Sequence, residues 1–377
     1  LYRMWSKTRL RHMAPWIAEW CLEEMFAGVE GKGAQDAAYD TALITEWCEL
    51  TGTDLTGGAA DIYKCFDQLS RPLIYMILGE AGMPTRVLDA YKKYLEELTI
   101  YNTIAGGLGE AYAKPTSIPQ GDPLSMMVVA IIMRAWIMQM RACAVKARLL
   151  ADDLQLISTG PRHLHHFVYA FNKTQAHLED MGARIAPQKC YTCSTNEAAR
   201  QWLTTHRWRR LQRTIPVVND IRDLGAHWCI TGRKVAPTLT RRMLETTTSI
   251  GRLDMFQAPY EKKAAIIKAK MLPKGLYGCE LGPINETAMR GFRTATASCL
   301  TYNTSRRSTD LTFAACSRGG DLDPDTEVVR RRIVGFRRAL AVQDGATQMA
   351  RDIFNKYDEE GHPGIAPTTT RQNSKPR

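Results

Sequence analysis

Three aspartates have the type and spacing that metal-dependent phosphoryl chemistry requires. Asp61 lies in a run of small and apolar residues that predicts a strand over residues 57–63, and Asp152 and Asp153 lie between two apolar flanks that predict a tight hairpin. Two magnesium ions about 3.5 to 4 Å apart need several carboxylates to neutralise them, one ion activating a hydroxyl and the other holding a triphosphate. Singly, each aspartate is more commonly a solvated turn residue or a cap, so the prediction rests on their joint context.

The elements around these acids are expected to be mixed, with antiparallel strands and helices. Apolar residues recur at helical spacing in several segments and alternate or cluster in others. The expected helices are residues 3–24, 36–47, 72–78, 87–98, 126–140 and 163–181, and residues 238–300 are expected to be mostly helical. The expected strands are 57–63, the hairpin of 99–104 with 110–117, the hairpin 148–157, and residues 185–195 and 216–228.

Three short segments carry motifs that occur in a fixed order along the chain. They are Asp61-Ile-Tyr-Lys-Cys-Phe-Asp67, Ser117-Ile-Pro-Gln-Gly-Asp-Pro-Leu-Ser125 and Leu150-Ala-Asp-Asp153. In this order they resemble the motifs of reverse transcriptases, most closely those of non-LTR retrotransposons. The first is similar to the first catalytic motif of that family, and the second closely matches its PQGxPLS motif. The third looks like its aromatic-x-Asp-Asp hairpin, with Leu150 in place of the aromatic that packs near the primer end. The resemblance covers most of the chain.

Four further segments resemble the family in the same order. Residues 26–36 are similar to its fingers motif, although Val29 replaces a phenylalanine. Residues 182–189 look like the motif that ends in a lysine near the triphosphate, here Lys189. Leu224 and Gly225 look like the primer-grip turn, and residues 271–280 resemble a thumb segment.

The resemblance implies an α+β right-hand polymerase, with a palm sheet backed by helices. Its expected parts are fingers over 1–56 with the hairpin 99–117, a palm over 57–235, a helical thumb over 236–300, a helical connection over 301–360 and a disordered tail over 361–377. Because the chain begins at Leu1, we expect a piece of a longer product with incomplete fingers.

The resemblance also assigns roles to site residues. Asp61, Asp152 and Asp153 would hold two Mg²⁺ ions, with Mn²⁺ as an alternative, and Lys189 would protonate or support the pyrophosphate leaving group. A solvated surface lysine is the alternative for Lys189. Phe66 looks like the steric gate that favours dNTPs, with a core phenylalanine as the alternative.

Residues that would contact the nucleotide or template are less specific. Gln120 and Gly121 either form a turn that starts a helix or lie beside the nascent base pair, and the motif order favours the second. Arg9, on a basic amphipathic helix, is a candidate for binding triphosphate or template, although such a face is commonly just solvated.

The charge balance favours a polyanionic partner. The chain has 377 residues with 50 basic and 39 acidic side chains, a net charge of +11, so RNA template and DNA primer are the expected partners. Basic clusters that suit phosphates, or alternatively a solvated face, are Arg207 with Arg209, Arg210 and Arg213, then Arg241 with Arg242, and Lys262 with Lys263, Lys268, Lys270 and Lys274. Trp202 and Trp208 are expected in the core rather than as stacking platforms.

Composition excludes several classes. Hydrophobic residues make up 45% and charged residues 24%, unlike disordered or collagenous chains. The longest apolar stretch, 126–140, is interrupted by Arg134 and is shorter than the roughly 20 residues of a spanning helix, so no membrane partner is expected. Ten scattered cysteines predict reduced thiols and an intracellular protein, and Cys190 and Cys193 lack the second ligand pair of a zinc site. Nuclear residence is implied by the family alone.

The leading functional hypothesis is RNA-templated DNA synthesis by two-metal-ion nucleotidyl transfer, from a retrotransposon-like element. The alternative is a catalytically impaired RNA-binding relic or maturase-like scaffold, which the change at Leu150 motivates. Three clustered acids argue against a purely structural palm, because like charges repel without metal. An RNA-dependent RNA polymerase is disfavoured by Phe66 and by the PQGDPLS loop.

Overall fold

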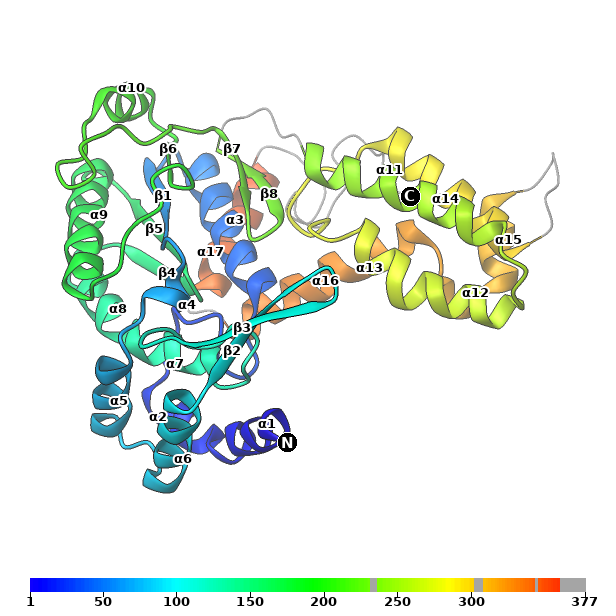
Figure 1. Ribbon diagram of the computed structural model, residues 1–377. Helices are drawn as coiled ribbons and strands as arrows, with labels where there is room; N and C mark the ends of the chain where they lie inside the picture. Colours follow the sequence, from blue (N-terminus) through cyan, green and yellow to red (C-terminus); the bar gives the residue numbers. More distant parts are fainter. Residues whose placement is uncertain (231–235, 302–307, 343–344, 360–377) are drawn as a thin grey trace. The chain divides into compact units, whose positions relative to one another are not determined.

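The computed structural model describes residues 1–230, 236–301, 308–342 and 345–359. The chain divides into two compact units, the first of Leu1–Ala34 with Asp54–Val218 and the second of Gln35–Thr53 with Asn219–Arg377 (Figure 1). The tail expected to be disordered, residues 361–377, lies outside the described residues, as does part of the expected connection.

The first unit is built on a four-stranded antiparallel sheet. Its order is β4 (Lys146–Leu150), β5 (Asp153–Thr159), β1 (Leu55–Asp61) and β6 (Tyr191–Ser194). Helix α9 (His163–Asp180) packs against β1 and β5. A Cβ atom on Gly58 would lie 2.4 Å from the Tyr191 carbonyl oxygen and 2.9 Å from Cζ of Phe167. Glycine in β1 therefore lets both β6 and α9 approach closely.

Helices surround this sheet and supply the core. The remaining helices of the first unit are α1 (Tyr2–His12), α2 (Ala14–Trp20), α4 (Cys65–Gln68), α5 (Arg71–Glu80), α6 (Thr85–Glu96), α7 (Ser125–Ile132), α8 (Arg134–Arg141) and α10 (Glu197–Thr205). The apolar stretch expected to be one buried helix is two helices that meet at Met133, whose ψ of −3° departs from helical geometry. Among the described residues, no helix has the length and apolar character needed to cross a membrane.

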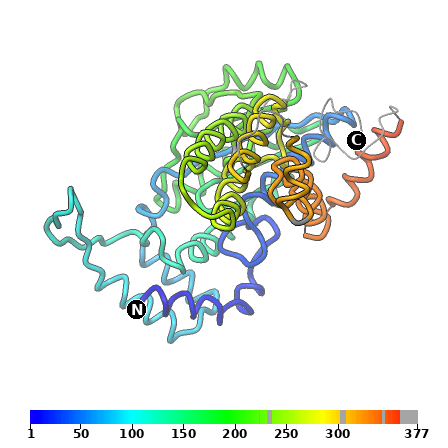
Figure 2. Tube along the Cα trace, turned by 90° about the vertical axis from the view of Figure 1, so that its right-hand side faces the viewer, coloured from blue at the N-terminus to red at the C-terminus, as the bar shows by residue number. Residues whose placement is uncertain are grey.

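The hairpin of β2 (Thr99–Ile104) and β3 (Gly107–Ala113) confirms the hairpin expected in this region. Both strands are exposed along nearly their whole length. In Figure 2 the hairpin extends away from the other elements of the first unit.

The second unit is mainly helical, which confirms the prediction for residues 238–300. Its described elements are α3 (Ala34–Thr51), β7 (Asp220–Asp223), β8 (Ala226–Cys229), α11 (Pro237–Asp254), α12 (Tyr260–Ile266), the π-helix η1 (Ile267–Met271), α13 (Leu272–Gly275), α14 (Glu286–Leu300), α15 (Thr309–Cys316), η2 (Arg318–Gly320), α16 (Pro324–Val342) and α17 (Ala346–Glu359). Helices α11 and α14 pack together around Met243 and Phe292, which are fully buried.

Two strand predictions differ from the structure. Residues 185–195 contain only the short strand β6. Ile185 makes a single bridge to Ile62 and the N–H of Ala186 donates to the Asp61 carbonyl oxygen, but residues 187–189 form a turn that ends this pairing with β1. Residues 216–228 do not form one strand but include the hairpin β7–β8, because Leu224 and Gly225 both have positive φ and reverse the chain.

Helix α3, expected among the fingers, packs in the second unit against α16 and α17. The indole nitrogen of Trp47 donates to Asp352 at 3.0 Å, and the hydroxyl of Tyr357 donates to Glu46 at 3.2 Å. Arg338 forms an ion pair with Asp36. The two compact units are defined by packing and not by function. The expected bounds of the fingers, palm, thumb and connection therefore stay predictions.

Candidate active site

The three aspartates lie at one end of the sheet in the first unit. Asp61, the last residue of β1, is the register partner of Asp153, the first residue of β5. Leu150 pairs with Asp153 across the β4–β5 hairpin, so Ala151 and Asp152 form its two-residue turn, and Ala151 has a φ of 56°. The antiparallel register therefore brings a strand end and a turn together, and with them the acids that are far apart in the sequence.

Lys189 reaches Asp61 from the loop after α9. Its Nζ lies 3.1 Å from each carboxylate oxygen of Asp61. The loop is tied to the end of β1 because the backbone N–H of Tyr63 donates to the Arg184 carbonyl oxygen and that of Ala186 donates to the Asp61 carbonyl oxygen, both at 2.8 Å. The Lys189 side chain is 62% exposed, whereas that of Asp61 is only 15% exposed. The ammonium group therefore reaches from solvent to a largely enclosed carboxylate.

Burial and charge act in opposite directions on these groups. Burial raises the pKa of Asp152, the negative charge of Asp61 raises it further, and Lys189 opposes both. The hydrogen bonds to Asp61 raise the pKa of Lys189, which is therefore charged at neutral pH. Burial also raises the pKa of the neighbouring Cys65 thiol to about 12, so this thiol is protonated and unreactive.

The donor set fits a divalent cation in its chemistry. Within the described residues, no group of three or more His, Cys, Asp or Glu side chains is arranged closely enough to hold a metal ion. Carboxylate oxygens are nevertheless the ligands that Mg²⁺ prefers, and the carboxylate of Asp61 already binds a cation, the ammonium of Lys189. The assignment of Asp61, Asp152 and Asp153 as metal ligands stays a prediction.

Phe66 lies on α4, directly after the end of β1, and is half-buried against the core. Its carbonyl oxygen accepts from the backbone N–H of Ile118, and that of Leu69 accepts from Ser117, both at 3.0 Å. The buried Arg71 donates to the Ser117 carbonyl oxygen at 3.1 Å. The start of the PQGDPLS loop is therefore fixed to the helix that carries Phe66.

The PQGDPLS loop makes a tight turn before α7. The backbone N–H of Asp122 donates to the Pro119 carbonyl oxygen at 3.2 Å, and the Ser125 hydroxyl donates to the same oxygen at 2.7 Å. Gly121 has a φ of 82°, and both Gly121 and Gln120 are exposed. The turn presents the glycine backbone and the glutamine amide to solvent, while Asp122 is buried.

In the second unit, the Leu224–Gly225 turn is held by two side chains. The guanidinium of Arg242, on α11, donates to the carbonyl oxygens of Gly225 and Tyr277 and lies 5.0 Å from the centre of the Tyr277 ring. The Tyr277 hydroxyl donates to the Leu224 carbonyl oxygen at 3.0 Å. The turn expected to resemble a primer grip is thus joined to the segment expected to resemble a thumb.

Comparison with known families decides what these motifs belong to. Residues 9–219, more than half of the chain, match the family described as reverse transcriptase (RNA-dependent DNA polymerase). The chain belongs to the reverse transcriptase family. The fold is accordingly the right-hand polymerase fold expected from the sequence.

Solved structures similar to this chain are telomerases of two Candida species. The Candida tropicalis telomerase in complex with the TWJ fragment of telomeric RNA has a TM-score of 0.47 and 10% identity, over 94% of this chain and 57% of that one. The Candida albicans telomerase in complex with the same kind of fragment has a TM-score of 0.43 and 13% identity, over 95% of this chain and 54% of that one. The reverse transcriptase thus spans a little over half of the telomerase chains. No curated protein matches its sequence.

Arg9 is exposed on α1, and a different arginine of this helix lies at the PQGDPLS loop. A Cβ atom on Gly121 would lie 3.6 Å from Nη2 of Arg3. The Tyr2 ring stacks on the Tyr94 ring with centroids 3.4 Å apart, which docks α1 on α6. Arg3 and Arg9 are six residues apart and point to different sides of the helix. Sequence reasoning identified the basic helix but not the arginine that meets the reverse transcriptase loop.

The two tryptophans after β6 differ in their surroundings. Trp208 is fully buried, which confirms its expected place in the core of the reverse transcriptase. Trp202 is 42% exposed, so its expected core position is wrong. The Trp202 ring stacks on the ring of His206, the residue directly after α10, with centroids 4.2 Å apart.

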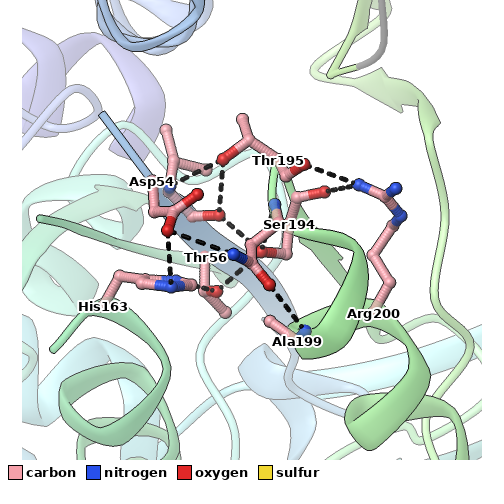
Figure 3. A network of polar contacts seen from close by, with 9 residues as sticks. Asp54, Thr56, His163, Ser194, Thr195, Ala199 and Arg200 are labelled. Atoms are coloured by element: carbon pink, nitrogen blue, oxygen red, sulfur yellow. Dashed lines mark hydrogen bonds and ion pairs between the residues drawn. The ribbon is translucent and has the colours of Figure 1, made fainter. Parts of the chain in front are cut away.

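A polar network that the sequence did not predict lies at the start of β1, away from Asp61 (Figure 3). His163 Nδ1 lies 2.6 Å from the Thr56 hydroxyl, which lies 2.9 Å from the Ser194 hydroxyl. Asp54 lies 3.7 Å from His163 Nε2 and accepts from Asn196 at 3.1 Å. The order Asp–His–Thr is that of a nucleophile site, but Thr56 and Ser194 are fully buried, so no substrate reaches them. The network ties β1, β6 and α9 of the reverse transcriptase together.

Proposed function

We propose that this chain carries out RNA-templated DNA synthesis by two-metal-ion nucleotidyl transfer, as part of a non-LTR retrotransposon-like element. The observation that carries the proposal is the pairing of Asp61 with Asp153 across β1 and β5, with Asp152 in the adjoining turn. Family membership over residues 9–219 supports it. The RNA template, the DNA primer and dNTPs are the proposed partners, and the nucleus is the proposed location.

Asp61, Asp152 and Asp153 would hold two Mg²⁺ ions, or Mn²⁺. When bound, such ions lower the pKa of an attacking hydroxyl and neutralise the charge on the leaving phosphate. The carboxylates themselves supply ligands and charge rather than acid–base chemistry. Burial and the neighbouring carboxylate of Asp61 raise the pKa of Asp152 because both disfavour its ionised form. A bound cation would stabilise that ionised form, as the proposed metal site requires.

Lys189 would serve the leaving group. Its charged ammonium lies at the carboxylate end of the sheet, on a loop fixed to β1 by two backbone hydrogen bonds. A proton or positive charge offered from this position would stabilise departing pyrophosphate.

Phe66 and the PQGDPLS loop would select and position the nucleotide. The hydrogen bond between Ile118 and the Phe66 carbonyl oxygen couples the proposed steric gate to the loop that carries Gln120 and Gly121. Arg3, which lies near Gly121, adds a cation suited to a phosphate. In the second unit, the Leu224–Gly225 turn would hold the primer and the helices around α11 would form the thumb.

The proposal is tested by primer extension on poly(rA)/oligo(dT) in Mg²⁺, with dTTP and UTP supplied separately. Incorporation of dTTP in clear preference to UTP supports reverse transcription. A preference for UTP would instead identify an RNA-dependent RNA polymerase.

One observation favours a second candidate, an RNA-binding relic or maturase-like scaffold. Lys189 already neutralises Asp61, and Leu150 stands where the family has an aromatic residue. Such a scaffold would bind RNA with strong salt dependence but would incorporate neither nucleotide.

A further inference from the structure

A cavity of about 320 Å³ opens on the outer face of α9 in the first unit. Four of its lining residues are spaced by three and four along α9, so they share one side of the helix. The opposite side carries Phe167 and Phe171, which are buried in the core. The lining residues are Tyr169, Asn172, Lys173 and Ala176 of α9, with Arg209 and Arg210 of the loop after α10.

The loop that forms the second wall is anchored. Trp208 is fully buried, with its ring 4.5 Å from that of Phe171, and its backbone N–H donates to the Arg213 carbonyl oxygen at 3.0 Å. Arg210 also forms an ion pair with Glu179 at the end of α9. Since Arg209 and Arg210 directly follow a buried anchor, the cavity is formed before any ligand binds.

The lining combines positive charge with an exposed ring. Lys173, Arg209 and Arg210 contribute three cations, of which Arg210 is paired with Glu179. In the part of the chain that the structure describes, no carboxylate forms an ion pair with Lys173 or Arg209. The Tyr169 side chain is 49% exposed, and Nζ of Lys173 lies 5.6 Å from the centre of its ring.

This combination suits a nucleotide unit within a strand. Cations bind phosphates, and an exposed aromatic ring stacks on any base, which is how proteins grip single-stranded nucleic acid. The volume lies at the lower end of the range of small-molecule sites. The surface of the cavity is mainly apolar, but three of its six lining side chains end in a cation, so it offers a place for a base bordered by groups that bind phosphate. A short stretch of a strand fits these features better than an enclosed small molecule.

We propose that this cavity binds single-stranded RNA, with phosphates at Lys173 and Arg209 and a base stacked on Tyr169. The choice of RNA over DNA rests on the proposed function, in which RNA is the template strand. The α9 residues of the lining lie on the side of the helix opposite Phe167, whose Cζ atom lies close to Gly58 of β1, so they face away from the sheet that carries the acids. The cavity is therefore a second RNA contact, apart from the carboxylates where synthesis is proposed.

The test measures binding of labelled oligo(rU) of about 16 nucleotides by fluorescence anisotropy. Mg²⁺ and dNTPs are left out, and saturating unlabelled RNA–DNA duplex occupies the proposed polymerase site at Asp61, Asp152 and Asp153. The variant Lys173→Glu/Arg209→Glu is compared with Arg86→Glu/Arg162→Glu, which makes the same charge change at exposed arginines outside the cavity. Thermal unfolding verifies that both variants fold.

We expect the cavity variant to bind oligo(rU) at least about 10-fold more weakly at moderate salt, and its log–log salt slope to fall by about 1.4, for two lost phosphate contacts. The control variant should retain the slope of the parent. Tyr169→Ala should weaken binding about 5- to 100-fold, as expected for one stacked base, and Tyr169→Phe should not.

The proposal is overturned if the parent does not bind oligo(rU) once duplex occupies the proposed polymerase site, or if both charge variants lose affinity equally. Equal binding of oligo(dT) would overturn the assignment to RNA. Because no synthesis is measured, failure here leaves the proposed polymerase activity untouched, and an inactive polymerase can still bind RNA at this cavity.

Discussion

Lys189 places its ammonium 3.1 Å from both carboxylate oxygens of Asp61, although 127 residues of chain separate the two side chains. The contact exists because residues 184–186 hydrogen-bond along the end of β1. In the proposed mechanism, this lysine compensates Asp61 in the resting site and serves the leaving group during synthesis.

Replacement of Lys189 should affect the chemical step. We expect Lys189→Met to lower the rate of dNTP incorporation by about 100-fold, because a positioned proton donor contributes at least that factor. Lys189→Arg should retain more activity, since it keeps the charge. Rapid-quench primer extension checks this, with Lys92→Met as the control. The KM of Lys189→Met for primer–template should be unchanged. A Lys189→Met enzyme with the rate of the parent would remove the lysine from the mechanism.

Shortening of Phe66 should relax sugar selection. Phe66→Val removes the bulk proposed to meet a 2′-hydroxyl, so the preference for dTTP over UTP in kcat/KM should fall by about 10- to 200-fold. The comparison is made on the same poly(rA)/oligo(dT) template. If the preference is unchanged while the variant remains folded, Phe66 is a core residue and not a gate.

Gly225 should be intolerant of a side chain. A Cβ atom there would lie 3.1 Å from the Tyr277 ring and 3.2 Å from the Arg242 guanidinium, at a φ of 77°. We expect Gly225→Ala to lower the free energy of unfolding by about 1 to 2 kcal/mol, with a weaker grip on primer–template. Gly251→Ala, in an open position of α11, should be neutral or stabilising by up to about 1 kcal/mol. Thermal unfolding measures both variants. An equal change in the free energy of unfolding would contradict the close packing of Tyr277 and Arg242 against Gly225.

Acid should destabilise the first unit through His163. Burial lowers the pKa of His163, while Asp54 opposes the shift, and the Thr56 hydroxyl that contacts its Nδ1 is uncharged. The unfolded state therefore takes up the proton first, and stability should fall as the pH drops below about 6.5 toward the lower native pKa.

His163→Gln should reduce this loss between pH 7.5 and pH 5.5, as measured by urea unfolding. Because burial also lowers the pKa of His177 and His206, part of the pH dependence should remain. A loss identical to that of the parent would show that His163 is not a source of the acid sensitivity.

The parts of the site that could be predicted from the sequence are local. Asp61 lies at a strand end and Asp152 in a hairpin turn because the apolar runs beside them determine both positions. Residues 99–104 formed the expected strand because Ala105 and Gly106, both with positive φ, make the two-residue turn that follows it.

Contacts between distant segments could not be read in this way. Arg3 rather than Arg9 faces Gly121 because the docking of Tyr2 on Tyr94 decides which side of α1 meets the loop. The resemblance identified Leu224–Gly225 as a turn, but the apolar pattern placed the same residues inside an expected strand, since leucine rarely adopts a φ of 49°. Its partners are Arg242 of α11 and Tyr277 of the turn after α13, and the packing that brings them to Leu224 and Gly225 has no local sequence signal.

The most direct test of the central claim compares primer extension on poly(rA)/oligo(dT) in Mg²⁺ by the parent chain, Asp152→Asn and Asp180→Asn. Asp180 is an exposed acid at the end of α9 and serves as the matched control. The account predicts dTTP incorporation by the parent and the control, and at least about a 100-fold loss in Asp152→Asn. Equal synthesis by all three, or none by any despite salt-sensitive RNA binding, would contradict it.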